Sequence, residues 1–229
     1  MNYNKNKNNL PKLFDIITLF PEAFSYLDSS LFKRAKEKNL IKINFWNPRD
    51  FTLDKHKTVD DYPYGGGPGM VLKPEPIYKA LQKAKSRNIN KRIIILTHPA
   101  GKLFNQKLAA ELSQYKQIII ISGHYEGIDA RIEKFVDIKI SIGKYILTGG
   151  ELPAMVIIDA ISRFIPGFLK DPYSREELRF KGFYSVPVYT RPAIWRPTKN
   201  VVLKVPKILL SGNHKEIENW KLKHRKKIL

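Results

Sequence analysis

The chain of 229 residues contains no cysteine and no long apolar run. Without cysteine it cannot form disulfides, use a thiol nucleophile or bind zinc through thiolates. Its apolar runs fall short of the roughly 20 residues that a membrane-spanning helix needs. The apolar stretch LFDIITLF near the N-terminus is not followed by the small-residue cleavage site of a signal peptide. These absences predict a soluble, cytoplasmic protein.

Acidic residues are scarce relative to basic ones. The sequence has 21 Asp and Glu against 41 Lys and Arg, which gives a formal net charge of +20. Such an excess attracts polyanions through a long-range electrostatic field and through the release of counterions. We therefore expect a nucleic-acid partner. The alternative is that the many Lys and Asn residues reflect the base composition of the genome.

The histidines form no metal-binding pattern. All five are scattered along the chain without H-x-x-x-H or H-E-x-x-H spacing. No metal site is predicted, and an isolated histidine such as His124 is interpreted as structural. Glu126 and Asp129 also have a structural interpretation, as caps of a helix, because acidic side chains are favoured at the start of a helix.

Strand-like and helix-like segments alternate along the first 164 residues. The Ile-rich runs 92–97 and 117–122 lack polar alternation, which is typical of parallel strands covered on both faces. Helical patterns such as 75–87 and 105–114 separate these runs. A further helical pattern begins at Pro21. The expected fold is α/β with a mostly parallel sheet.

The composition changes along the chain and suggests its division. Residues 1–11 are predicted to be a polar, disordered leader, and residues 12–164 form the main domain. Residues 165–190 are expected to be a basic linker. Residues 191–229 are expected to form a small, mainly helical domain, whose last helix begins with a capping-box-like pair, Asn213 and Glu216.

Three glycine-bearing turns follow predicted strands: THPAG, SGHYEG and SIGKYILTGG. In an open parallel sheet the carboxyl ends of the strands share one edge, so these turns are expected to line a common pocket. Glycine allows backbone groups to approach a ligand closely. None of the turns fits G-x-G-x-x-G or G-x-x-x-x-G-K-[ST], so the sequence indicates neither a dinucleotide site nor a phosphate-binding loop.

Longer motifs resemble one family of enzymes. The segments WNPRDFTLDKHKTVDDYPYGGGPGMVLKPEP, SGHYEGIDARI, SIGKYILTGGELPAM, IDAISRFIPG, YTRP and LLSGNHKEIENWKLK are similar to those of bacterial tRNA (guanine-N1)-methyltransferases, which are knotted methyltransferases of the SPOUT class. The resemblance implies a homodimer with a deep trefoil knot. It also implies methyl transfer from S-adenosylmethionine to guanine N1 of the guanosine immediately 3′ of the tRNA anticodon.

The resemblance also implies which residues bind the cofactor. Its pocket would follow three successive strands, and backbone atoms would make much of the contact. Carried over by position, the cofactor-binding residues are Pro99, Gly101, Gly123, Tyr125, Glu126, Ile142, Gly143, Lys144, Tyr145, Ile146, Leu147, Gly149, Gly150 and Pro153. The sulfonium of the cofactor is positive, so a carboxylate at Glu126 is electrostatically reasonable. No metal ligand is implied.

Guanine N1 carries a proton at neutral pH, so the reaction needs a general base. In the family this base is a linker aspartate, and alignment places Glu177 at its position, with Glu176 and Asp171 as competitors. Arg163 matches the family arginine that stabilises charge developing on the guanine O6. The alternative is that this linker is a solvated loop in a catalytically weakened or inactive tRNA-binding protein.

The remaining matches concern the substrate. Asp60 and Asp61 resemble the start of a loop that lines the dimer and substrate site in the family. Basic residues of the linker and last helix are candidates for phosphate contacts, or form a solvated basic face: Arg191, Arg196, Lys221, Lys223 and Arg225. The sequence stops at Leu229, so a trimmed tRNA-binding domain is expected. A knotted methyltransferase with another RNA site is a further alternative.

Overall fold

The computed structural model describes residues 10–87, 89–171 and 186–226. The chain divides into two compact units, Met1–Leu169 and Lys170–Leu229. The finer predicted division into leader, main domain, linker and terminal domain stays a prediction.

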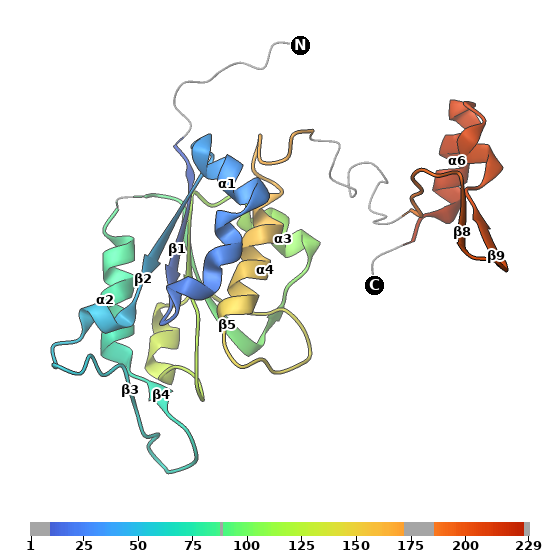
Figure 1. Ribbon diagram of the computed structural model, residues 1–229. Helices are drawn as coiled ribbons and strands as arrows, with labels where there is room; N and C mark the ends of the chain where they lie inside the picture. Colours follow the sequence, from blue (N-terminus) through green and yellow to red (C-terminus); the bar gives the residue numbers. More distant parts are fainter. Residues whose placement is uncertain (1–9, 88, 172–185, 227–229) are drawn as a thin grey trace. The chain divides into compact units, whose positions relative to one another are not determined.

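A five-stranded parallel sheet forms the centre of the first unit (Figure 1). The strand order is β2-β1-β6-β5-β7, and every neighbouring pair is parallel. The central pair joins segments that are distant in sequence, with Leu13 opposite Gln117. This arrangement confirms the α/β prediction. The strands are β1 (Lys12–Ile17), β2 (Ile41–Trp46), β5 (Arg92–Leu103), β6 (Gln117–Ile121) and β7 (Ile138–Ser141).

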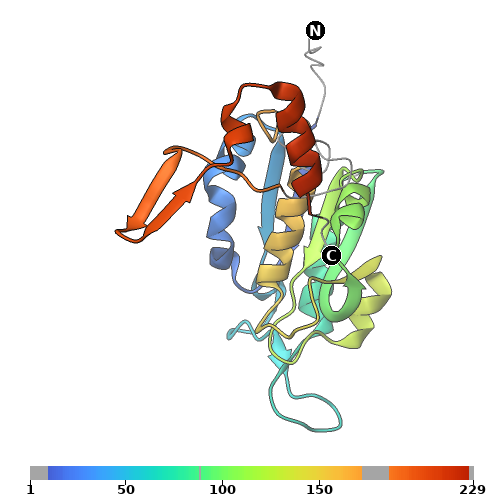
Figure 2. The same ribbon diagram turned by 90° about the vertical axis from the view of Figure 1, so that its right-hand side faces the viewer.

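Helices cover both faces of this sheet. On one face lie η1 (Pro21–Asp28), α1 (Ser30–Glu37), α3 (Gln106–Leu112) and α4 (Glu151–Ser162). On the other face lie η2 (Pro48–Phe51), α2 (Pro74–Lys85) and η3 (Ala130–Phe135). Both views show α4 between η1 and α3 (Figures 1 and 2).

The core has two layers because side chains alternate along each strand. Ile118 and Ile120 of β6 pack into the layer beneath α4, while Ile119 and Ile121 pack into the layer beneath α2. All four are fully buried. Continuous apolar strands are therefore required here, because both faces of the sheet are covered.

Two elements differ from the sequence prediction. The helical pattern that begins at Pro21 is broken after Asp28, where Ser30 has a φ of 46° and starts α1 in a new direction. Strand β5 extends beyond the predicted 92–97 to Leu103, because Lys102 and Leu103 resume pairing with β7 after a register shift. The turn THPAG therefore lies within a strand that bulges outward.

A short hairpin flanks the sheet. Its strands β3 (Asp60–Asp61) and β4 (Val71–Leu72) pair in antiparallel fashion. Four glycines of the intervening loop, at positions 65, 66, 67 and 69, have positive φ angles. This loop therefore needs a backbone conformation that other residues rarely adopt.

The second unit contains a β-hairpin and two helical segments. Strands β8 (Ile194–Thr198) and β9 (Val201–Lys204) precede η5 (Lys207–Leu210) and α6 (His214–His224). Asn213 caps α6 by accepting a hydrogen bond from the Glu216 amide at 3.3 Å, as predicted. The hairpin was not predicted, because Pro197 in its first strand disguises a β pattern. The unit is therefore not purely helical.

Candidate functional site

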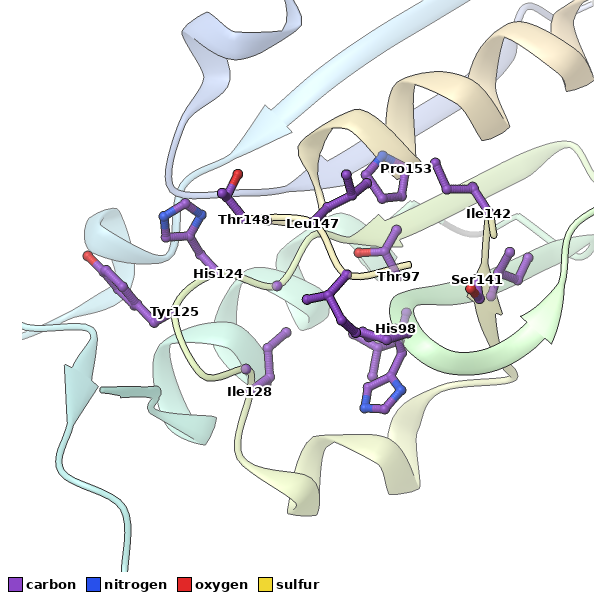
Figure 3. Close-up of a pocket in the computed structure, with 18 of the residues that line it drawn as sticks. Thr97, His98, His124, Tyr125, Ile128, Ser141, Ile142, Leu147, Thr148 and Pro153 are labelled. Carbon is purple, nitrogen blue, oxygen red and sulfur yellow. The ribbon is translucent and has the colours of Figure 1, made fainter. Parts of the chain in front are cut away.

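A pocket of about 340 Å³ lies at the carboxyl edge of the sheet, where β5, β6 and β7 meet their following loops. Its walls come from three segments, around Thr97–Pro99, Gly123–Ile128 and Ile140–Pro153. In Figure 3, His124 and Thr148 lie near each other on one side of the pocket, and Ser141 and Ile142 lie on another. The volume is within the range of small-molecule sites, which is roughly 300–1,000 Å³.

The loop after β7 packs tightly against the ends of β5 and β6. The Gly150 amide donates a hydrogen bond to the Gly123 carbonyl at 2.7 Å. A Cβ atom on Gly150 would lie 2.2 Å from Thr97 Oγ1 and 2.8 Å from the Gly123 nitrogen. Only glycine allows this approach, so the wall at this point consists of backbone atoms.

The pocket lining is negative although the protein is strongly basic. Among the described residues, the lining contains Glu126 and Glu133 and includes no Lys or Arg. Glu133 accepts a hydrogen bond from Lys139 Nζ at 2.8 Å, and this bond holds the pKa of its carboxyl below the usual value. Glu133 is therefore ionised at neutral pH, and Lys139 balances its charge, which leaves Glu126 as the lining carboxylate that can face a cationic ligand. A ligand that carries a positive charge suits such a lining better than a phosphate does.

Asp129, and not Glu126, is the acidic residue that caps the start of a helix. Asp129 precedes η3 and accepts a hydrogen bond from the Arg131 amide at 2.9 Å. Its pKa is lowered mainly by a side-chain hydrogen bond from Arg131. Glu126 lines the pocket, and its amide donates to the Met70 carbonyl at 3.1 Å, which ties the β3–β4 hairpin to the pocket loop.

Most of the residues predicted to bind a cofactor line this pocket. The exceptions are Gly101 and Lys144. Gly101 packs against β7 instead, where a Cβ atom would lie 2.5 Å from the Ile140 nitrogen. The Lys144 side chain is exposed. The role of the lining residues as cofactor contacts stays a prediction.

Sequence reasoning missed several lining residues. Thr97, His98, His124, Ser141 and Thr148 belong to the wall. All five lie within the quoted glycine turns, so the turns themselves were the signal. His124 was interpreted as structural because its spacing fits no metal or catalytic pattern.

Behind the wall lies a buried carboxylate that the sequence did not single out. Glu151 is 8% exposed at the start of α4. Thr18 Oγ1 donates to its Oε1 atom at 3.3 Å, and His124 Nδ1 lies 3.7 Å from its Oε2 atom. Glu151 is thus held between β1 and the loop after β6.

The residues predicted to act on the substrate fall in different parts of the chain. Asp61 of β3 forms an ion pair with Lys73 at 3.2 Å, which lowers its pKa through a hydrogen bond, and Asp60 is half-buried beside it. Arg163 is half-buried at the C-cap of α4. Glu176 and Glu177 lie outside the described residues, and Asp171 is exposed.

The predicted phosphate-binding residues belong to the second unit. Arg191, Arg196 and Lys223 are exposed, whereas Lys221 and Arg225 are half-buried. Beside Arg196, Trp195 of β8 is 56% exposed. The hairpin therefore presents an aromatic ring and cations on its surface.

The described residues offer neither a metal centre nor a membrane-spanning helix. Within the part of the chain that the structure describes, no group of three or more His, Asp or Glu residues could hold a metal ion. In the same part, none of the helices has both the length and the apolar character needed to span a membrane.

Comparisons with known proteins place this architecture in a family. Residues 12–228 match the family described as tRNA (Guanine-1)-methyltransferase TrmD. A tRNA (guanine-N(1)-)-methyltransferase of Dictyoglomus turgidum is 51% identical over 91% of this chain and 83% of its own length. The enzyme of the same name from Clostridioides difficile is 51% identical over 91% of this chain and 90% of its own.

A solved structure agrees with these sequence matches. The crystal structure of a tRNA (m1G37) methyltransferase from Aquifex aeolicus superposes with a TM-score of 0.76 and is 44% identical. The match covers 93% of this chain and 89% of that one. The chain therefore belongs to the tRNA (Guanine-1)-methyltransferase family.

Proposed function

We propose that this protein transfers a methyl group from S-adenosylmethionine to N1 of the guanosine immediately 3′ of a tRNA anticodon. The observation that carries the proposal is a glycine-walled pocket with two carboxylates and no Lys or Arg among its described lining residues. Such a lining suits a sulfonium cation and disfavours a phosphorylated cofactor. Family membership supports the reaction and its guanine target.

The pocket residues fit this cofactor. Backbone atoms of Gly123 and Gly150 allow close approach, and the apolar side chains of Ile142, Leu147 and Pro153 can cover an adenosyl group. When bound, S-adenosylmethionine supplies a methyl group made electrophilic by its positively charged sulfur. Glu126, which lines the pocket, would supply a carboxylate to offset that positive charge.

Proton removal and charge stabilisation fall to two further residues. Glu177 accepts the N1 proton of guanine, which frees the nitrogen lone pair for attack. Arg163 holds a positive charge beside O6, where negative charge develops as the proton leaves. Arg163 lies at the C-cap of α4, where the chain leaves the helix toward the segment that carries Glu177 in the sequence.

The path of the chain supports the expected trefoil knot. After edge strand β7, the loop returns to the ends of β5 and β6, where Gly150 contacts Gly123 and Thr97. Beyond its bulge, β5 pairs with β7 again, through Lys102 and Ile140. A knotted path requires the later part of the chain to return in this way to the ends of earlier strands.

Exposed apolar side chains support the expected homodimer. Ile146 of the pocket loop is 79% exposed, and Leu152 and Val156 of α4 are 56% and 45% exposed. Leu152 and Val156 lie one helical turn apart, so they share a face of the helix. Exposed apolar groups that gather in this way mark protein interfaces. A second copy of this chain would cover them.

The tRNA affinity is expected to depend steeply on salt, because each neutralised phosphate releases counterions. With roughly six to ten phosphate contacts, affinity should fall by about 10³–10⁵ between about 50 and 200 mM salt. Replacing Arg196 or Lys223 by alanine should reduce the slope of log K against log salt by about 1. Filter binding across a salt series measures the slope.

Thr198→Ala in the same hairpin is the matched control, since it removes no charge and should leave the slope unchanged. A flat salt dependence of the wild-type affinity would contradict phosphate binding by this basic surface.

One experiment tests the proposed reaction. The protein is incubated with S-adenosylmethionine labelled in its methyl group and with tRNA transcripts that differ only at the position 3′ of the anticodon. Transfer that requires guanosine there, with label recovered as N1-methylguanosine, supports the proposal. Transfer to another position would show a related methyltransferase with a different site. Tight binding without transfer would show a tRNA-binding protein that has lost its activity.

A further inference from the structure

His124 has a polar atom that the fold leaves without a hydrogen bond. Its Nδ1 atom is buried and has no hydrogen-bond partner among the described residues. The ring lies against Phe20, with 4.7 Å between centroids, and against Tyr125, with 4.9 Å. Both neighbours are aromatic, so neither offers Nδ1 a strong acceptor. A buried polar atom without a partner is costly and calls for an explanation.

The carboxylate of Glu151 faces this atom. Its Oε1 atom accepts a hydrogen bond from Thr18, and its Oε2 atom lies 3.7 Å from His124 Nδ1. At 3.7 Å the pair is slightly too far apart for a hydrogen bond. The carboxylate itself is favoured in the first turn of α4, because the helix dipole is positive at its N-terminus. A small movement of either side chain would bring donor and acceptor together.

Gly149 lies between the two groups. A Cβ atom on this residue would be 2.2 Å from Glu151 Oε2 and 2.8 Å from His124 Nδ1. The backbones of Gly149 and His124 form an isolated antiparallel bridge. Because Gly149 has no side chain, the imidazole of His124 and the carboxylate of Glu151 can face each other directly. Both groups lie at the wall of the pocket.

We infer that His124 and Glu151 are a positioning pair for the wall formed by Gly149 and Gly150. His124 carries its proton on Nδ1, and the 3.7 Å gap to Glu151 Oε2 closes to a hydrogen bond when a ligand presses on this wall. The pair thereby joins the loop after β6 to the start of α4. The identity of the ligand, S-adenosylmethionine, rests on the proposed function, whereas the pairing itself does not.

The first test examines the free protein. Nitrogen-15 correlation spectra of the imidazoles report which ring nitrogen is protonated, and the signals of His124 are assigned by their loss in His124→Asn. We expect the Nδ1–H tautomer in the wild type. Addition of S-adenosylmethionine should shift the Nδ1 proton downfield, as its hydrogen bond shortens. A neutral ring protonated on Nε2, with Nδ1 bare, would overturn the proposal.

The second test measures cofactor affinity by calorimetry. His124→Leu removes the donor and should weaken S-adenosylmethionine binding by about tenfold, the usual effect of one hydrogen bond to a charged group. His124→Asn places an amide N–H near the Nδ1 position and should retain affinity within about threefold of the wild type. Exposed His56 provides the control, since His56→Leu should bind as the wild type does.

A double-mutant cycle with Glu151→Leu ties the two residues together. If they act as a pair, the double variant should bind no worse than His124→Leu alone. Thermal melting of each variant separates loss of fold from loss of affinity, and His124→Asn keeps the test valid if the leucine variants unfold. Equal weakening by Leu and Asn at position 124, or additive losses in the cycle, would overturn the pairing. Wild-type protein that does not bind S-adenosylmethionine would overturn the proposed function instead.

Discussion

Replacing Glu177 by glutamine is expected to lower the single-turnover rate of methyl transfer by about 10²–10⁴-fold, which is the usual contribution of a general base. Glutamine keeps the size of the side chain but cannot accept the N1 proton of guanine at neutral pH. The equilibrium affinity for tRNA should stay within about threefold of the wild type, because the role proposed for Glu177 concerns a reacting proton and not a phosphate. Rapid-quench assays with saturating tRNA measure the rate.

The neighbouring acids supply matched controls. Glu176→Gln and Asp171→Asn make the same chemical change close by in the sequence and should retain most of the rate. If either of these variants abolished transfer while Glu177→Gln did not, the residue changed in that variant, and not Glu177, would be the general base. Full activity of all three variants would remove the linker carboxylate from the mechanism.

Gly150→Ala is expected to weaken S-adenosylmethionine binding in calorimetry by about tenfold to 100-fold, because an extra methyl group forced into a closely packed site costs about 1–3 kcal/mol. The added methyl group would lie 2.2 Å from Thr97 Oγ1 and 2.8 Å from the backbone nitrogen of Gly123. The backbone atom cannot rotate away. The loop must therefore move outward and lose the 2.7 Å hydrogen bond between Gly150 and Gly123.

Gly123→Ala is the comparison for this variant. Its methyl group would meet only the Ile128 side chain, at 3.5 Å, which is an ordinary contact. We expect a much smaller loss of affinity than for Gly150→Ala, although both residues line the pocket. Similar affinities of the two variants for S-adenosylmethionine would show that the loop at Gly150 can move at little cost. The close approach of Gly150 to Gly123 would then not determine the affinity.

The sequence predicts the sheet well because burial dictates its residues. The run from Ile118 to Ile121 alternates between two core layers, so every position must be apolar, and no amphipathic pattern is possible. The glycine turns were predicted to share a pocket for a similar reason: parallel strands end at one edge. Both predictions rest on general rules. One concerns the residue pattern along a strand that is buried on both faces, and the other concerns the edge at which neighbouring parallel strands end.

The features that escaped prediction depend on contacts between distant segments. The Pro and Gly of THPAG indicate a turn, yet β5 continues to Leu103 because Ile140 and Ser141 of β7 offer partners for it. Glu151 reads as an ordinary acid at a helix start, and only the fold reveals that Thr18 and His124 face it.

The long separation between paired strands has a consequence for how the protein reaches its native state. Strand β1 pairs with the central strand β6 at Leu13 and Gln117, so the middle of the sheet cannot form until about half of the chain has been made. Pairing between such remote segments slows folding, because closing a large loop costs conformational entropy before the stabilising contacts form. The walls of the pocket come from β5, β6 and the segment after β7, and the last wall ends at Pro153. During synthesis, a ligand of this pocket should therefore bind only after Pro153 has been made, so its binding would report the formation of the sheet and of these three walls.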